Sequence, residues 1–145
     1  MLERAAGHLD RDRDRAIEAT EACFRFLDSN GVLHTADEEE SVFPRLMGRL
    51  SEEEGAFVAN LEAQHREADH LYAELKSIAR ELHGGPPECE LQERYRVAAE
   101  RLTELYRFHI VAEDQTLIAI CQRVLQVPEL AEISAEMKRR RGLPT

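Results

Sequence analysis

Two segments of the sequence carry a histidine and a glutamate four residues apart, a separation that places both side chains on one face of an α-helix. The pairs are His34 with Glu38 and His109 with Glu113. An imidazole nitrogen and a carboxylate oxygen at this spacing can bind one metal ion, and carboxylates can bridge two ions. This set of donor atoms suits iron, manganese or zinc. The repeated spacing therefore predicts a metal-binding cluster.

A third histidine, His65, and both pairs interrupt stripes of apolar residues. His65 belongs to a run with helical spacing: Leu61, His65, Ala68, Tyr72, Leu75, Ala79 and Leu82. The second pair lies in a similar run: Leu102, Leu105, His109, Glu113, Leu117, Ile120 and Val124. Val42 and Leu46 continue the row of the first pair. Residues on such stripes face the core of a helical protein, where a carboxylate must be paired, hydrogen-bonded or metal-bound.

The other histidines do not share this position. On a helical wheel His70 falls on a polar row and is expected to face solvent. His83 belongs to a segment that ends a helix, and His8 precedes the first strong helical stripe. Glu39 and Glu40 are expected to form part of an exposed acidic face. The predicted metal ligands are therefore His34, Glu38, His65, His109 and Glu113, and the alternative is that these are ordinary pairs within helices.

Several long helices must position these residues. Ser51 and Glu54 have the spacing of a capping box, which predicts a helix start. Pro44 is expected to kink its helix rather than end it, and the sequence 28–31, DSNG, predicts a bend or break. A basic run at 138–141 is expected to be a solvated tail or a complement to a helix C-terminus. The expected helices cover residues 10–28, 32–49, 51–82, 88–126 and 129–140.

The composition predicts an all-α protein with one domain over residues 1–145. Ala, Glu, Leu and Arg supply 74 of 145 residues, whereas the strand-forming Val and Ile supply 13. No apolar run is long enough for a membrane span or a signal peptide, so we expect a cytoplasmic protein. The net charge of −10 makes nucleic acid a poor partner. The three cysteines fit reduced thiols better than a disulfide framework.

Three segments resemble the hemerythrin-like, or HHE cation-binding, domain family. Residues 34–46, HTADEEESVFPRL, are similar to its H-x-x-x-E-E-x-x-[LV]-F-P segment. Residues 64–68, QHREA, are similar to its single-histidine segment, and residues 108–114, FHIVAED, to its final H-x-x-x-E-[DN] segment. The resemblance implies an up-down antiparallel four-helix bundle with a non-haem di-iron centre. In that centre His34, His65 and His109 would be terminal ligands, and Glu38 and Glu113 would bridge the irons.

One departure from the family concerns its first helix, which usually supplies a further histidine well upstream of the H-x-x-x-E segment. Only 33 residues precede His34, so we expect this first helix to be short or missing, with a short helix added at the C-terminus. A groove lined by Leu61, Tyr72, Leu105 and Val124 would then be partly open. Because such apolar surface is normally covered, a homodimer is expected.

The resemblance leaves three functions open. The first is a di-iron protein that binds or senses a small oxidant such as dioxygen, peroxide or nitric oxide. The second is an enzyme-like centre that reduces peroxide or nitric oxide or repairs iron centres, which would need an electron source that the sequence does not show. The third is a metal-free helical interaction module. No catalytic residue is predicted, and the five site residues are predicted only as metal ligands.

Overall fold

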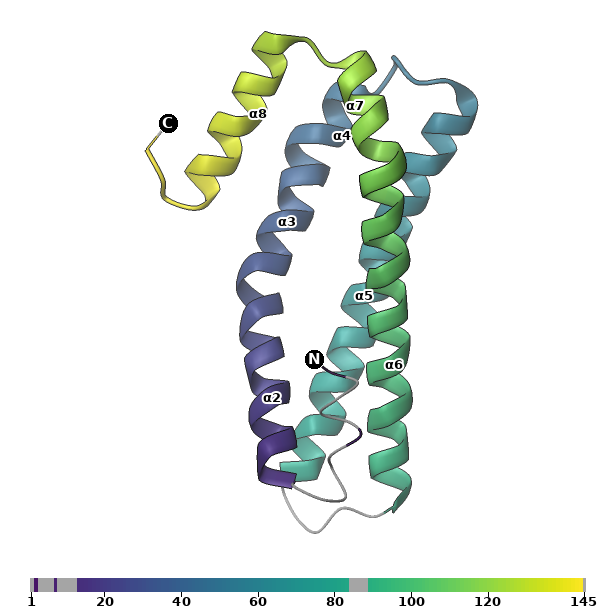
Figure 1. Cartoon of the computed structure of the whole chain (residues 1–145), viewed down its shortest axis with the longest axis vertical. Helices are drawn as coiled ribbons and strands as arrows, with labels where there is room; N and C mark the ends of the chain where they lie inside the picture. The colour runs from purple at the N-terminus through teal and green to yellow at the C-terminus, as the bar shows by residue number, and fades with distance from the viewer. Residues whose placement is uncertain (1, 3–6, 8–12, 84–88, 145) are drawn as a thin grey trace. The chain divides into compact units, whose positions relative to one another are not determined.

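The described residues of the computed structural model are 2, 7, 13–83 and 89–144, and they form helices without any strand. This confirms the predicted all-α class. The elements in chain order are α2 (Arg13–Phe26), η1 (Leu27–Gly31), α3 (Val32–Asp37), η2 (Glu38–Val42), α4 (Phe43–Leu46), α5 (Glu52–His83), α6 (Cys89–Ala112), η3 (Glu113–Leu117), α7 (Ile118–Val124) and α8 (Val127–Arg140) (Figure 1). Those labelled η are π-helical turns.

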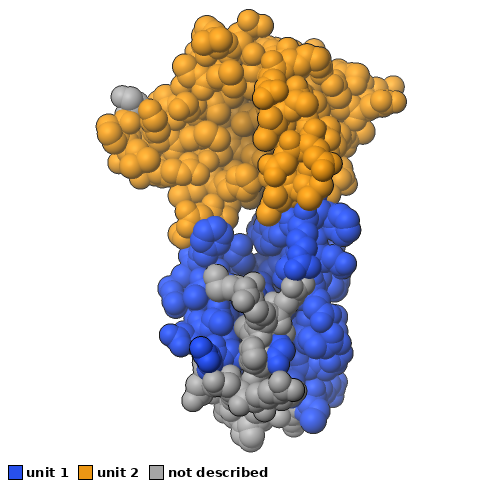
Figure 2. Space-filling model, in the orientation of Figure 1, with its two compact units in different colours: residues 1–27, 66–108 blue, residues 28–65, 109–145 orange. Residues whose placement is uncertain are grey.

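The chain divides into two compact units, coloured separately in Figure 2. Unit 1 comprises Met1–Leu27 and Arg66–Phe108, and unit 2 comprises Asp28–His65 and His109–Thr145. The α5 and α6 helices each contribute to both units. The expectation of one domain over the whole chain stays a prediction.

Unit 1 is built on helical segments with a shared apolar core. Leu75 and Ile78 of α5 and Leu102 of α6 are fully buried in it. A buried polar contact links α2 to α6, where the Thr20 and Tyr95 hydroxyls lie 2.5 Å apart. The residues of the predicted apolar stripe on α5 that belong to this unit, Ala68, Leu75, Ala79 and Leu82, lie in this core.

Unit 2 holds all five predicted ligands. It consists of the η1–α4 stretch, the start of α5, the end of α6 with η3 and α7, and α8. Its core residues come from each of these stretches: Phe43, Leu46, Val58, Leu61, Leu117, Ile120, Leu125 and Ile133. Because this cluster encloses Leu61 completely and includes Ile133 of α8, the expectation that Leu61 lines an open groove is wrong.

Three π turns interrupt the regular α-helices, and one of them, η1, covers the residues at which the sequence predicts a bend or break. The bend or break expected at residues 28–31 is wrong, because Gly31 is helical with φ −62° and ψ −51° and the chain continues from η1 into α3. Pro44 lies in the first turn of α4, where its missing N–H is tolerated, and the irregular turn η2 precedes it. The helix expected over 88–126 is divided by η3. Such turns are often found at functional sites.

The helix ends follow local rules. Met47 leaves the helical conformation and Gly48 has φ +76°, a value that favours glycine. The Ser51 N–H donates to Glu54 Oε2 at 2.9 Å and the Glu54 N–H donates to Ser51 Oγ at 3.2 Å, which confirms the predicted capping box. A second capping box, on Gln126, starts α8 two residues before the predicted position.

Two further expectations concern the membrane and the N-terminus. In the part of the chain that the structure describes, none of the helices has the length and apolarity that a membrane crossing requires. The expectation of a short or missing first helix falls mainly on residues 1–12, most of which lie outside the described residues, as does His8.

Candidate metal centre

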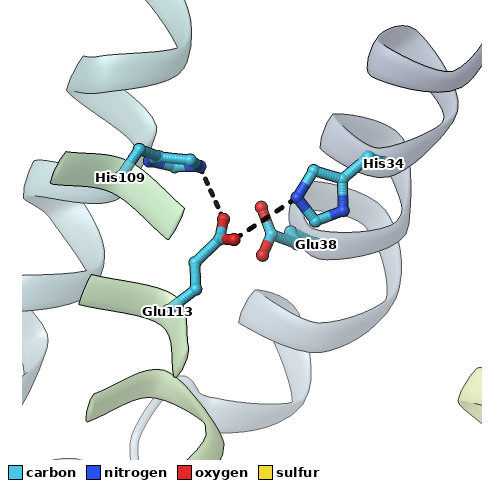
Figure 3. A group of neighbouring side chains, drawn as sticks. All are labelled: His34, Glu38, His109 and Glu113. Atoms are coloured by element: carbon cyan, nitrogen blue, oxygen red, sulfur yellow. Dashed lines mark ion pairs between the residues drawn. The ribbon is translucent and has the colours of Figure 1, made fainter. Parts of the chain in front are cut away.

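Five side chains from separate helical stretches converge inside unit 2. His34 comes from α3, Glu38 opens η2, and Glu113 opens η3. His34, Glu38, His109 and Glu113 each offer one ligand atom, and these four atoms lie within 4.8 Å of one another (Figure 3). His65, on α5, joins the group because its Nε2 lies 3.1 Å from Glu38 Oε2 and 3.1 Å from His109 Nε2. The structure therefore brings all five predicted residues together.

Glu113 links two of the histidines. Its Oε1 lies 2.5 Å from His109 Nε2, and its Oε2 lies 3.4 Å from His34 Nε2 (Figure 3). Glu38 makes the corresponding contact with His65 from the opposite helical stretch. Each glutamate is the first residue of its π turn. The two wide turns thus carry the two carboxylates into the same space.

Burial within the cluster is uneven. Glu38, His65, His109 and Glu113 are buried, but 52% of the His34 side chain is exposed. The cluster therefore has an edge that solvent reaches at His34.

Two carboxylate oxygens in the cluster have no hydrogen-bond donor. Glu38 Oε2 and Glu113 Oε1 are completely buried, and neither accepts a hydrogen bond from any described residue. Their close neighbours are Nε2 atoms of His65 and His109, at 3.1 Å and 2.5 Å. Buried acceptors without a donor cost stability. A bound cation satisfies such oxygens, so the donor set fits a metal ion.

The other ring nitrogen of each buried histidine is already engaged. His65 Nδ1 lies 2.8 Å from Glu39 Oε1, and His109 Nδ1 lies 2.9 Å from Gln64 Oε1. Because a carboxylate or amide oxygen can only accept, both Nδ1 atoms must carry the proton. The Nε2 atoms of both rings then point into the cluster, which is the orientation that metal-binding histidines have in proteins.

Apolar packing fixes the His65 ring further. The buried Phe43 ring stacks on it with a centroid separation of 6.2 Å and an interplanar angle of 12°. The His65 and His109 rings meet edge to face at 4.7 Å. These two ring contacts restrain the orientation of the His65 side chain.

Burial and contacts within the cluster shift the pKa values of its side chains in different directions. Burial raises the pKa of Glu38. Burial alone would also raise the pKa of Glu113, but the close contacts with His109, His34 and Glu38 outweigh it and lower this pKa. The hydrogen bond to Glu113 raises the pKa of His34. Burial lowers the pKa of His65, but the contacts with Glu38 and Glu39 outweigh it and raise this pKa. Metal binding would displace protons from these side chains.

Sequence reasoning missed the residues that orient the ligands. Glu39 was expected only on an acidic face, and Gln64 was given no role, although it directly precedes His65. Their position next to a predicted ligand was the available signal, but it does not reveal the partner ring. His70 is exposed, as predicted. The side chain of His83 lies outside the described part of the chain.

Comparison with known families agrees with this geometry. The family model described as "Hemerythrin HHE cation binding domain" matches residues 1–121. This range contains all five residues of the cluster and ends before α8. No curated protein and no solved structure matches the chain.

Proposed function

Since this chain belongs to the hemerythrin family of HHE cation-binding domains, we propose that it holds a non-haem di-iron centre that binds or senses a small oxidant. The proposed ligands are His34, Glu38, His65, His109 and Glu113. The observation that supports this most strongly is the pair of buried carboxylate oxygens, on Glu38 and Glu113, that accept no hydrogen bond from the described residues. Dioxygen, peroxide and nitric oxide are the proposed oxidants.

The chemistry of the donor atoms supports iron. Three imidazole nitrogens with two carboxylates suit iron, manganese or zinc, and carboxylates can bridge two ions in helical bundles. Bound iron would supply redox chemistry and coordination positions that exchange. The five residues offer fewer ligands than two octahedral ions require, which leaves positions for an external molecule. The exposed edge at His34 gives such a molecule its approach.

Metal loading tests this proposal. Protein loaded anaerobically with Fe(II) and freed of excess metal should contain about two iron ions per chain, and its melting temperature should rise because the ions bind only the folded state. Elemental analysis and thermal melting measure these effects. Exposure to dioxygen, peroxide or nitric oxide should then change the visible absorption. Absence of iron after loading, with an unchanged melting temperature, would contradict the di-iron proposal and favour a metal-free interaction module.

Turnover separates binding from catalysis. If the loaded protein consumes peroxide or nitric oxide repeatedly with an added reductant, the centre is enzyme-like. If one equivalent of oxidant changes the spectrum and no further oxidant is consumed, the protein binds or senses it. We propose the second outcome, because neither the sequence nor the described residues outside the cluster indicate an electron donor.

We also propose that the chain forms a homodimer. Ile110 and Val111, at the end of α6, and Ile118, at the start of α7, lie in unit 2. Each of these side chains is about half exposed. Association that covers such side chains removes apolar surface from water. Sedimentation equilibrium at micromolar concentration should give a mass of two chains, and Ile118→Glu should shift it toward one chain. A mass of one chain for the unchanged protein, independent of concentration, would rule out the dimer.

A further inference from the structure

The C-terminal helix α8 lies outside the family match but contacts the helical stretch that carries Glu38. In unit 2, α8 packs against α3 and η2 (Figure 1). Ion pairs join the two stretches in antiparallel order: Asp37 with Arg140 and Arg141, Glu40 with Arg140, Arg45 with Glu132 and Glu136, and Arg49 with Glu129. The basic run at 138–141 is therefore partly a set of tertiary contacts, and the expectation of a solvated tail is wrong for Arg140 and Arg141.

The strongest of these contacts involves Asp37, the residue before Glu38. Its side chain is only 2% exposed, and both of its oxygens are paired. Arg140 Nη1 donates to Oδ1 at 2.9 Å, and Arg141 Nη2 lies 2.6 Å from Oδ2. A buried carboxylate is costly unless its charge is matched. These two guanidinium groups therefore fix where the end of α3 lies against α8.

Arg140 also reaches across the π turn. Its Nη2 donates to Ser41 Oγ at 2.8 Å and to Glu40 Oε2 at 3.1 Å. Only 17% of its side chain is exposed. One planar guanidinium thus binds residues on both sides of Glu38, a geometry that arginine can adopt and lysine cannot reproduce.

A second arginine holds the end of the same turn. Arg45 Nη1 donates to the Ser41 carbonyl oxygen at 2.8 Å. The same guanidinium donates to both carboxylate oxygens of Glu136 on α8, at 3.0 Å and 2.8 Å. Ser41 is completely buried. Its hydroxyl accepts from Arg140 and its carbonyl oxygen accepts from Arg45, so both arginines bind this residue of η2.

The π turn needs such support. Isolated π turns are rare, which indicates that their surroundings must stabilise them. Within the described chain no side chain caps η2, and Glu38 Oε2 accepts no hydrogen bond that could anchor it. Arg140 and Arg45 restrain η2 from outside, in addition to the contact of Glu39 with His65 and the packing of Val42 on the core.

We propose that α8 positions the metal ligand Glu38, with Arg140 holding η2 in the register that directs this carboxylate into the cluster. The expected effect on metal affinity rests on the proposed function. Arg140 is thus a positioning residue that acts through Asp37 and Ser41. The rest of α8 keeps Arg140 in place through its own packing and ion pairs with the stretch that carries Glu38.

Arg140→Gln tests the proposal, with Arg49→Gln as a matched control. Arg49 also pairs with α8 through both oxygens of a glutamate, Glu129, but at the opposite end of that helix from Arg140. Arg140→Gln should weaken Fe(II) affinity, measured anaerobically by chelator competition, by about tenfold or more, as expected for a residue that orients a ligand. Arg49→Gln should leave the affinity unchanged. Arg140→Lys should restore only part of the loss.

A second measurement uses metal-free protein. Amide hydrogen exchange over residues 38–42 should be about tenfold faster in Arg140→Gln than in the unchanged protein, and unchanged in Arg49→Gln. If Arg140→Gln does not fold, Ser41→Ala removes one acceptor of the same guanidinium and should show both effects in weaker form. If the unchanged protein binds no metal, the proposed function fails, and the exchange rates still decide whether Arg140 holds η2.

Two results would overturn the inference. One is equal loss of Fe(II) affinity in Arg140→Gln and Arg49→Gln, which would reduce α8 to a general stabiliser of the fold. The other is exchange over residues 38–42 that does not respond to Arg140→Gln. In either case Glu38 is positioned by its own helical stretch.

Discussion

Glu113→Ala should abolish metal binding. Glu113 contacts both His34 and His109, so its loss removes one ligand and leaves two others without the carboxylate between them. Substitution of residues that only orient ligands costs about 10–100-fold in metal affinity, and removal of a ligand should exceed this range. Iron content after anaerobic loading and gel filtration measures the effect. His109→Ala should give the same result because it removes a buried ligand.

His70→Ala is the control for these variants. His70 lies on α5, as His65 does, but its side chain is exposed. Iron content should therefore match that of the unchanged protein. Thermal melting of each variant without metal separates ligand loss from unfolding. Loss of iron in His70→Ala equal to that in His109→Ala would contradict the assignment of the cluster.

Glu38→Gln should remove metal binding and at the same time stabilise the metal-free protein. Burial raises the pKa of Glu38 above its ordinary value of 4.5, so the folded state disfavours the charged form. One of its oxygens is also buried without a hydrogen bond from the described residues. A glutamine carries no charge and can donate to a neighbouring acceptor. The free energy of unfolding at pH 7 should increase by about 1–3 kcal/mol, the usual cost of an unsatisfied buried group.

The pH dependence gives this prediction its sign. A carboxyl group whose pKa is raised in the folded state makes its full contribution to the free energy of unfolding below its unfolded pKa. This contribution is lost as the pH rises through the folded pKa. Glutamine avoids that loss, so the difference between Glu38→Gln and the unchanged protein should be largest at neutral pH and should shrink toward pH 4. Urea unfolding with a chelator present measures it.

Glu113→Gln provides a comparison with the opposite expected sign. The close contacts of Glu113 with His109 and His34 lower its pKa, so its charged form is favoured in the folded state. Its replacement should therefore lower the free energy of unfolding at neutral pH. If both glutamine variants shift stability in the same direction, the two carboxylates do not differ in the way that their contacts indicate.

The helical period accounts for what the sequence predicted well. His65 and His109 were assigned to apolar stripes, and both are buried with Leu61 and Leu102 of the same stripes. Such a pattern is local, because residues three and four apart share a face whatever lies beyond the helix. The same rule placed His70 in solvent.

The π turns could not be predicted in this way. Their extra residue changes the phase of the helix, and no residue type in η2 or η3 marks it. The sequence DSNG at 28–31 has residues typical of a turn, yet the chain does not break there and instead forms the π turn η1. Local propensity is weak compared with the tertiary contacts that a continuous helix makes.

The contacts that orient the cluster depend on tertiary structure as well. Asp37 and Arg140 are far apart in the sequence, and neither lies in a pattern that identifies the other. Gln64 and His109 are likewise on different helices. A single sequence shows which residues lie inward on a helix but not which distant group each will meet.

The uneven burial of the cluster separates the speed of metal exchange from the strength of metal binding. The four buried residues fix the geometry and thereby set the equilibrium constant of the proposed centre. His34 is the predicted ligand with a half-exposed side chain, so it can meet a hydrated ion before that ion has lost its remaining water. In the proposed centre, His34 would also be the ligand that a chelator in solution reaches first. The exposure of His34 would therefore bear mainly on the rate of metal exchange, and the four buried residues would bear mainly on the affinity.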